Sequence, residues 1–367
     1  MKKSHPLISS ENKLKLAIFG LNVSSGCSMT DMPETLQVTW EESKEIALMA
    51  ERIGIEAVIP VARWKGMGGK INFNHRNFEP LTWAAGLAAA TSTIGIFATV
   101  HVPTVHPVRI AKEVATIDLI SKGRFGLNIV AGWNTRELAM FGLNQRDHSD
   151  RYDCADEWIS LCKEIWTQSD EFDFDGKYFQ AAAVYSEPKP YQTPFPLLMS
   201  AGNSSRGQRY AAEHTDINFV VAPDSDAAGS IAKEVKLLAK SDFNKDISVY
   251  GQAYIVCRDT ETEAKEYLDY YVNERGDQAG VENLLDILIP NSKSALDTGW
   301  RAMADNMIAG YGAIPLVGTP EQVVEGMRAF ADNGIDGITL SWVDYKAGLS
   351  QFEKDILPLM RDAGLRQ

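Results

Sequence analysis

The sequence predicts an α/β protein of the TIM (β/α)8 barrel class, with insertions in the barrel. Eight short apolar segments alternate with amphipathic helical patterns along the 367 residues. These segments are apolar on both faces, which is typical of parallel strands that are covered on both sides. No G-x-G-x-x-G turn follows the first segment, and its absence disfavours the open dinucleotide-binding sheet.

The predicted elements follow one another in a regular order. The eight strands are expected at residues 14–22, 55–62, 94–100, 124–130, 196–202, 217–222, 248–257 and 336–343. Helical patterns are expected at residues 39–54, 79–91, 107–121, 151–168, 204–215, 226–241, 260–275, 318–334 and 352–364. Local signals mark several ends: Gly54 stops the first helix, Pro107 occupies a first-turn position, and Thr319 is an N-cap before Pro320 at N1.

Two segments interrupt this order within what we predict to be one barrel domain spanning residues 1–367. Residues 170–194 are rich in aromatic residues, Asp and Pro, and are expected to form an inserted hairpin. Residues 278–315 contain no clear strand. Because long structureless connections are uncommon in compact domains, we expect this second insertion to be a functional lid or a subunit contact.

Composition and charge exclude several classes of protein. The net charge of −13 disfavours binding to nucleic acid or to an anionic membrane, because both need clustered Lys and Arg. No apolar run approaches the length of a membrane helix, and the first residues do not resemble a signal peptide. The four scattered cysteines and the six histidines form no metal-binding motif. We therefore expect a cytoplasmic protein with free thiols and no metal site.

The chemistry should lie where the strands end, because barrel enzymes place their active sites at the C-terminal ends of the strands. Amides, hydroxyls, glycines and aromatic residues follow several predicted strands, but neither a nucleophile–base pair nor a carboxylate pair does. Such a collection suits a bound cofactor that carries the difficult chemistry. The segment AGNSSRG at residues 201–207 joins a strand to a helix N-terminus, where backbone N–H groups can hold a phosphate; an ordinary N-cap is the alternative.

Several stretches together resemble the bacterial luciferase-like family of flavin-dependent monooxygenases. They are ATIDLISKGRFGLNIVAGW (115–133), DHSDRYDCADEWISLCKEIWT (147–167), SAGNSSRGQRYAAEHTD (200–216) and LVGTPEQVVEGM (316–327). Residues 63–99 are most similar to the pyrimidine oxygenase branch, and alkanesulfonate and dimethyl sulfone monooxygenases are also similar. The resemblance covers residues 15–365 and implies a barrel with insertions that assembles as a homodimer or homotetramer.

The resemblance also implies roles for individual residues. Those expected to bind FMN are Ala62, Arg63, Asn128, Glu137, Arg151, Tyr152 and Ser204. Those expected to be catalytic are Thr99, Asn128 and Trp133, which with Ile59 would form the pocket that places O2 beside flavin N5. The dimethyl sulfone enzymes lack a match to Thr99, so its presence favours the pyrimidine branch.

The substrate pocket is expected to include Ile59, Trp64 and His101. Where the pyrimidine branch has Ala and Thr, this chain has His101 and Val102. Because these positions point toward the substrate, the sequence leaves open a substrate other than uracil.

The predicted function is a two-component monooxygenase that uses reduced FMN (FMNH2) and O2. A separate NAD(P)H:flavin reductase would supply the flavin, and a flavin peroxide, possibly formed at N5, would oxygenate a pyrimidine-like cyclic amide or a related heterocycle. The alternatives are cleavage of a C–S bond in a sulfonate or sulfone, a flavin or deazaflavin oxidoreductase that inserts no oxygen, and a flavin-binding protein without activity. A barrel hydrolase is disfavoured, because no carboxylate pair stands at the strand ends.

Overall fold

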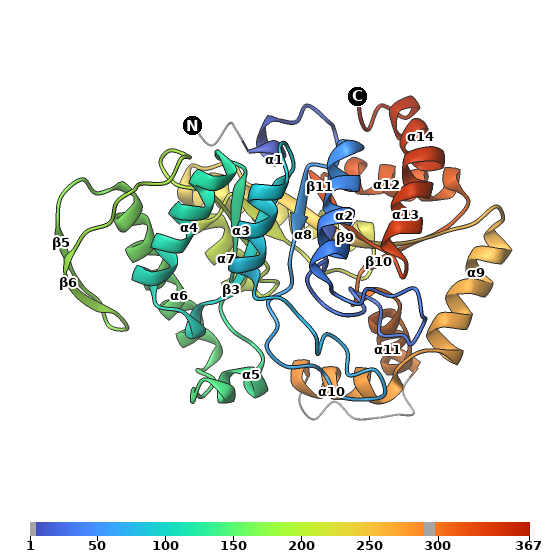
Figure 1. The fold of residues 1–367 in the computed structure, drawn as a ribbon, viewed down its shortest axis with the longest axis horizontal. Helices are drawn as coiled ribbons and strands as arrows, with labels where there is room; N and C mark the ends of the chain where they lie inside the picture. Colours follow the sequence, from blue (N-terminus) through green and yellow to red (C-terminus); the bar gives the residue numbers. More distant parts are fainter. Residues whose placement is uncertain (1–4, 290–297) are drawn as a thin grey trace.

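The computed structural model describes residues 5–289 and 298–367, so that residues 290–297 of the predicted second insertion lie outside the described residues. A ring of parallel strands forms its centre (Figure 1). The sheet order is β10-β9-β11-β1-β2-β3-β4-β7-β8, and β8 also pairs with β9, so eight of the nine strands close a ring that excludes β10. The predicted barrel class is confirmed. The ring strands are β1 (Lys15–Phe19), β2 (Ala57–Ile59), β3 (Gly95–His101), β4 (Phe125–Val130), β7 (Leu197–Ser200), β8 (Ile217–Phe219), β9 (Ser248–Cys257) and β11 (Gly337–Ser341).

Helices surround the ring and connect successive strands. The longer ones are α2 (Trp40–Arg52), α3 (Pro80–Ala90), α4 (Pro107–Ser121), α6 (His148–Thr167), α7 (Ser205–His214), α8 (Ser225–Phe243), α9 (Glu261–Asp269) and α12 (Pro320–Asp332). The shorter segments are α1 (Pro6–Ser9), α5 (Thr135–Met140), α13 (Tyr345–Gln351) and α14 (Leu357–Asp362), with π-helical turns at Tyr270–Glu274 and Phe352–Ile356. The predicted start of α12 is confirmed, because Thr319 and Gln322 form a capping box there.

The strands are apolar on both faces because each face meets a different part of the core. Outward residues such as Leu127 and Ile129 pack against the helices, whereas inward residues such as Phe97 and Met199 fill the barrel. Side chains alternate along a strand, so inward positions recur every second residue. Along β3 and β4 this alternation brings polar residues to the interior as the strands approach their C-terminal ends.

The two segments predicted as insertions contain elements that lie outside the ring, and a strand that the sequence pattern did not reveal begins at the end of the second. The first insertion holds the antiparallel hairpin of β5 (Phe172–Asp175) and β6 (Gln180–Val184). The second holds α10 (Gln278–Leu288) and α11 (Thr298–Gly310), and β10 (Ile314–Gly318) begins at its end. β10 pairs with the C-terminal half of β9, outside the ring. Its first two residues, Ile314 and Pro315, fall within residues 278–315, where no clear strand was expected. Pro315 is tolerated there because β10 is an edge strand.

The second insertion is joined to the loop that follows β2. Asp277 accepts hydrogen bonds from the backbone N–H groups of Lys70 (3.0 Å) and Ile71 (2.9 Å) and also caps α10 through Gly280 N (2.9 Å). A Cβ at Gly69 would lie 2.4 Å from both Asp277 and the Gly280 nitrogen, so this close approach requires glycine. Figure 1 shows α5 and α10 on one side of the barrel and α1 and α14 on the opposite side.

Within residues 5–289 and 298–367, none of the helices combines the length and the apolar character that a membrane crossing requires.

Candidate active site

A cavity of about 340 Å³ opens at the C-terminal ends of the barrel strands. Seven of the residues predicted for the site line it together: Ile59, Ala62, Arg63, Thr99, His101, Asn128 and Trp133. The rest of its wall consists of Phe19, Pro60, Val61, Val130, Met199, Ala201, Asn203, Phe219, Val221, Gln252, Leu288, Met307 and Tyr311. A mostly apolar cavity with a few convergent polar groups is the usual form of a small-molecule site.

Thr99 and Asn128 form one hydrogen-bonded unit on the cavity wall. They are direct neighbours in the parallel register of β3 and β4. The Thr99 hydroxyl donates to the Pro60 carbonyl (2.6 Å) and accepts from Asn128 Nδ2 (3.2 Å). This chain fixes the amide orientation, because the hydroxyl proton is already used and Thr99 can only accept. Asn128 Oδ1 is left buried and without a partner among the described residues.

A buried ion pair forms the neighbouring part of the wall. Arg63 Nη1 lies 3.4 Å from Glu137 Oε1, and both side chains are only 1% exposed. Arg63 Nη2 donates to the Tyr311 hydroxyl (2.9 Å), and its guanidinium carbon lies 5.3 Å from the centre of the Trp133 ring. Glu137 is in the first turn of α5, whose N-cap is Asn134, and does not itself line the cavity. The Glu137 carboxylate therefore contacts the Arg63 guanidinium from outside the cavity and fixes its position.

The histidine on this wall is held uncharged. His101 ends β3 and is 4% exposed, and its Nδ1 lies 3.7 Å from Glu137 Oε2. Burial lowers the pKa of His101 from 6.5 to about 4, while the charge of Glu137 opposes this shift and that of Arg63 reinforces it. Burial likewise lowers the pKa of His5, at the opposite end of the barrel, from 6.5 to about 3.

These two depressed pKa values predict a loss of stability in acid. Below pH 6.5 the unfolded chain binds protons that the folded chain does not, so stability is fully present above pH 6.5 and falls as the pH falls towards 4. We expect His101→Gln to make this decline shallower by about 1.4 kcal/mol per pH unit. Urea unfolding of both proteins at pH 7.5, 6 and 5 measures the difference. Parallel curves would contradict the assignment, because His5 is common to both proteins.

The β7–α7 connection, which the sequence analysis predicted to bind a phosphate, adjoins the cavity. Ser204 is the N-cap of α7 and accepts a hydrogen bond from Gly207 N (3.1 Å). A Cβ at Gly202 would lie 2.6 Å from the Gly207 Cα and 2.7 Å from the Tyr152 hydroxyl, so the turn packs tightly against α6. Asn203 lines the cavity beside Ser204. A helix N-terminus beside the cavity is suited to an anionic group.

The two arginines near this turn have different surroundings. Arg206 is paired with Asp153 (3.1 Å) and Asp156, so its charge is already balanced. Arg151, on α6, donates from Nη1 to the Gly132 carbonyl in the loop after β4, where Gly132 has a φ of +92°. Its Nε is buried and without a partner among the described residues. Arg151 lines a neighbouring depression between α6 and the loops after β3 and β4, instead of the main cavity.

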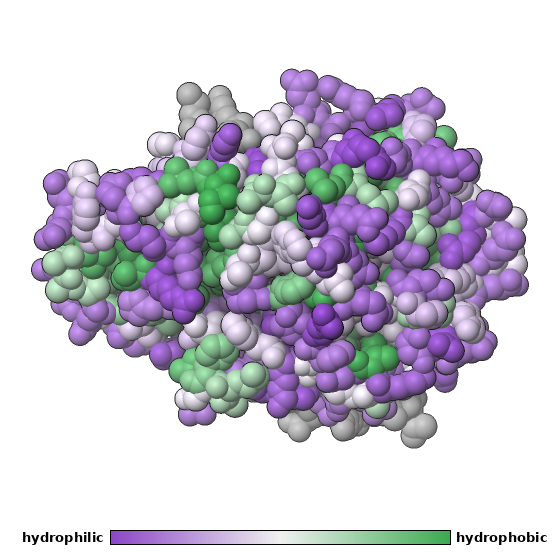
Figure 2. Space-filling view, in the orientation of Figure 1, coloured by the Kyte–Doolittle hydropathy of each residue, from purple (hydrophilic) through white to green (hydrophobic). Residues whose placement is uncertain are grey.

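Trp64 is the one predicted pocket residue whose side chain faces outward. Its backbone N–H donates to Glu137 Oε1 (2.8 Å), while the indole is 40% exposed and packs edge-on against Phe141. Met140 and Leu143, at the end of α5 and just after it, are also exposed. Figure 2 shows a hydrophobic area over α5 within a mostly hydrophilic face. Anchoring of the backbone by Glu137 explains why a tryptophan near a strand end does not reach the cavity.

The second insertion contributes three cavity residues that the sequence analysis did not identify: Leu288, Met307 and Tyr311. Tyr311 reaches the site from a left-handed conformation (φ 59°), and burial raises the pKa of its hydroxyl. The only available signal was the length of the insertion, which predicted a functional role but no particular residue.

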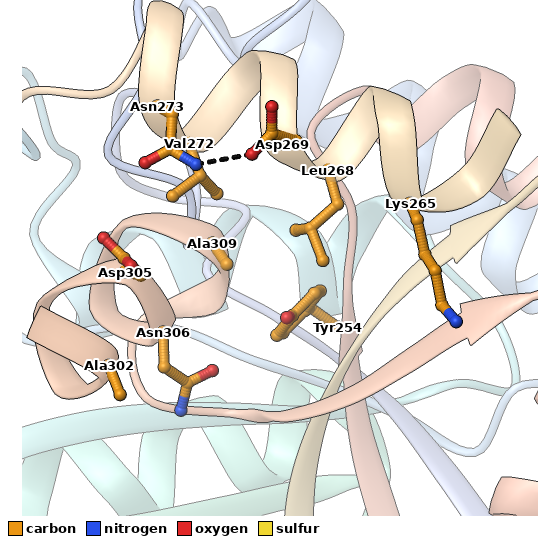
Figure 3. Close-up of a pocket in the computed structure, with 10 residues that line it drawn as sticks. All are labelled: Tyr254, Lys265, Leu268, Asp269, Val272, Asn273, Ala302, Asp305, Asn306 and Ala309. Atoms are coloured by element: carbon orange, nitrogen blue, oxygen red, sulfur yellow. Dashed lines mark hydrogen bonds between the residues drawn. The ribbon is translucent and has the colours of Figure 1, made fainter. Parts of the chain in front are cut away.

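A second cavity, of about 370 Å³, lies outside the barrel between α9 and α11 (Figure 3). Its charged lining residues, Lys265, Asp269 and Asp305, come from the helices and not from strand ends, and Asp269 accepts a hydrogen bond from Asn273 (2.7 Å). Lys265 is paired with Glu261. This cavity therefore lacks the position and the unsatisfied polar atoms of the main one.

The barrel and its cavity define an enzyme that binds a small cofactor and substrate at the strand ends. The chain belongs to the luciferase-like monooxygenase family, whose model matches residues 19–337. It is therefore a flavin-dependent monooxygenase.

Comparison with individual proteins agrees with this assignment. The chain is 30% identical over 354 residues to the pyrimidine monooxygenase RutA of Acinetobacter baylyi, with 95% of each chain covered. It is 31% identical over 353 residues to the RutA of Yersinia enterocolitica, again with 95% of each covered. Among solved structures, the riboflavin lyase RcaE, with modified FMN and riboflavin, shares the fold (TM-score 0.86, 21% identity, covering 96% of this chain and 92% of that one).

Proposed function

We propose that this protein is the oxygenating component of a two-component system, and that it uses reduced FMN and O2 to oxygenate a pyrimidine-like cyclic amide or a related heterocycle. The curated relatives of nearly full length carry the name pyrimidine monooxygenase, which supports this substrate class. A separate NAD(P)H:flavin reductase would deliver the flavin, and we expect a homodimer or homotetramer in the cytoplasm.

The unsatisfied oxygen of Asn128 is the observation that carries this proposal. A buried acceptor without a partner costs about 1–3 kcal/mol, so such an atom calls for a ligand that donates to it. The reduced isoalloxazine ring has N–H groups that can do so. The Thr99 hydroxyl donates its proton to the Pro60 carbonyl, so it has none to offer a ligand. Its role is to orient the Asn128 amide.

The remaining contacts would divide between the ring and the phosphate of FMN. Ala62 and Arg63 would border the ring, and Trp133 with Ile59 would wall the O2 pocket. Ser204, Tyr152 and the start of α7 would hold the phosphate, and the unpartnered Nε of Arg151 is available nearby. Glu137 would act on FMN indirectly, by holding Arg63 in place beside the ring.

Bound reduced FMN would supply two electrons, so that one oxygen atom of O2 enters the substrate and the other leaves as water. The chain itself would orient the ring through Asn128 and exclude water with the apolar wall formed by Phe19, Phe219 and Met307. His101 would face the substrate.

Oxygen consumption with photoreduced FMN, in the absence of NADH, tests this function directly. We expect substrate-dependent O2 uptake and a product heavier by one oxygen atom when a panel of cyclic amides is supplied. Product formed under strictly anaerobic conditions would instead indicate hydride transfer, and tight FMN binding without O2 uptake would indicate a binding protein. A lack of FMN binding in either redox state would overturn the proposal.

Ser204→Ala is expected to weaken FMN binding by about tenfold, because it removes a hydroxyl at the phosphate turn and an N-cap worth about 1 kcal/mol. Quenching of flavin fluorescence measures the dissociation constant. Riboflavin, which lacks the phosphate, provides the control: its affinity should be the same for both proteins. An equal loss for FMN and riboflavin would show that the substitution disturbs the cavity and not a phosphate contact.

A further inference from the structure

His101 presents one ring nitrogen to a carboxylate, and no partner for the other is found among the described residues. Its Nδ1 lies 3.7 Å from Glu137 Oε2, and the ring lines the main cavity. Within residues 5–289 and 298–367, the approach of Nδ1 to Glu137 is the one polar contact found for this ring. The identity of the proton-bearing nitrogen therefore decides what the cavity offers to a substrate.

The surroundings of Glu137 decide this question. Its Oε1 accepts hydrogen bonds from Trp64 N (2.8 Å), Lys65 N (3.2 Å) and Arg63 Nη1 (3.4 Å). Its Oε2 is buried without a hydrogen-bond partner among the described residues, and it faces the His101 ring. A nitrogen lone pair directed at a carboxylate oxygen is repelled, whereas an N–H is attracted, so the proton belongs on Nδ1.

Burial keeps the ring neutral, because the charges around it act in opposite directions. Glu137 on α5 and Arg63 after β2 are the charged groups that act on His101, and they balance one another. Arg63 is the single charged residue that lines the cavity within the described part of the chain. A neutral ring with its proton on Nδ1 has a lone pair on Nε2, and this lone pair accepts hydrogen bonds.

We propose that His101 is a specificity-determining residue: oriented by Glu137, it accepts at Nε2 a hydrogen bond from an N–H group of the substrate. The cavity then selects neutral heterocycles and cyclic amides that carry an N–H. It rejects their N-methylated forms, and it rejects sulfonates, because the wall has no unbalanced positive charge to receive an anion. This inference rests on the proposed function and narrows its substrate class.

The tautomer can be measured without flavin or substrate. Nitrogen-15 NMR of histidine-labelled protein at pH 7 distinguishes the two ring nitrogens, and His101→Gln identifies the signals. We expect the proton on Nδ1 of His101. Two other histidines provide opposite references, because the Nδ1 atoms of His5 and His106 accept from Leu7 N (3.2 Å) and Val108 N (3.3 Å) and their protons must lie on Nε2. A proton on Nε2 of His101 would overturn the proposal.

The selectivity is tested with uracil, 1-methyluracil, 3-methyluracil, the dimethylated form and an alkanesulfonate. We expect wild type to prefer an N–H compound over its methylated counterpart by about 10- to 100-fold in kcat/KM, and His101→Phe to abolish the preference by slowing only the N–H compound. His101→Gln, which keeps an acceptor, should restore part of it. An unchanged preference in His101→Phe, or efficient turnover of the dimethylated form, would overturn the proposal.

Failure of this inference and failure of the proposed function give different results. If FMN binds but the protein oxidises only the alkanesulfonate, the N–H substrate class is wrong while the monooxygenase assignment stands. If FMN does not bind, the proposed function fails.

Discussion

Replacing Glu137 with alanine is expected to lower the free energy of unfolding by about 3–5 kcal/mol, the usual cost of leaving a buried charge without its partner. The substitution removes the counter-ion of Arg63 and the acceptor for two backbone N–H groups, those of Trp64 and Lys65. Chemical denaturation followed by circular dichroism measures this loss.

The exposed pair of Arg109 and Glu113 provides the matched control for this prediction. Its atoms lie closer (2.8 Å), but the arginine side chain is 74% exposed. Glu113→Ala should therefore change stability by no more than about 1 kcal/mol. Arg63→Met/Glu137→Met, which removes both charges, is expected to be more stable than Glu137→Ala. Similar losses in Glu137→Ala and Glu113→Ala would contradict the account of Glu137 as a buried support of the cavity wall.

Asn128→Ala is expected to reduce kcat/KM for the oxygenation by about 10- to 100-fold, the effect of losing a hydrogen bond to a buried ligand. The variant removes the unsatisfied oxygen that faces the cavity, and it also frees the hydroxyl of Thr99 from its donor. O2 uptake with photoreduced FMN is the appropriate assay, because it does not depend on a reductase.

Asn218→Ala separates this functional effect from a loss of stability. Asn218 is a fully buried asparagine on β8 that donates to the Ser200 carbonyl (3.1 Å) and does not line the cavity. Both alanine variants should lose comparable stability, whereas only Asn128→Ala should lose activity. Equal turnover by Asn128→Ala and wild type would remove Asn128 from the mechanism.

The barrel could be predicted from the sequence because each strand has its own local signal. Runs such as residues 94–100 are apolar on both faces and lie between helices with clear caps, so propensity, pattern and turn residues agree. β10 was missed because Pro315 interrupts an already short segment, and its pairing with β9 is a long-range contact without a local signal. Short α5 was missed for a similar reason: it has only six residues and depends on the Asn134 cap.

The candidate site could be predicted in part. Strand direction placed Thr99, His101 and Asn128 at one end of the barrel, and the structure brings them to one cavity. The support of Arg63 by Glu137 and Tyr311 could not be predicted, because it joins α5 and the second insertion through side-chain contacts across the fold. For Trp64, the position after a strand end was predicted correctly, but the sequence did not determine the direction of the side chain, which is exposed.

The placement of sulfur atoms has a consequence for an enzyme that handles oxygen. Cys27, Cys154, Cys162 and Cys257 are all buried as free thiols, and none of these four lines the cavity. Met199 and Met307 do line it. Any stray oxidant released near the flavin would therefore meet thioethers before thiols, and the first lesion would be methionine sulfoxide, which cells can reduce, instead of an irreversible cysteine acid.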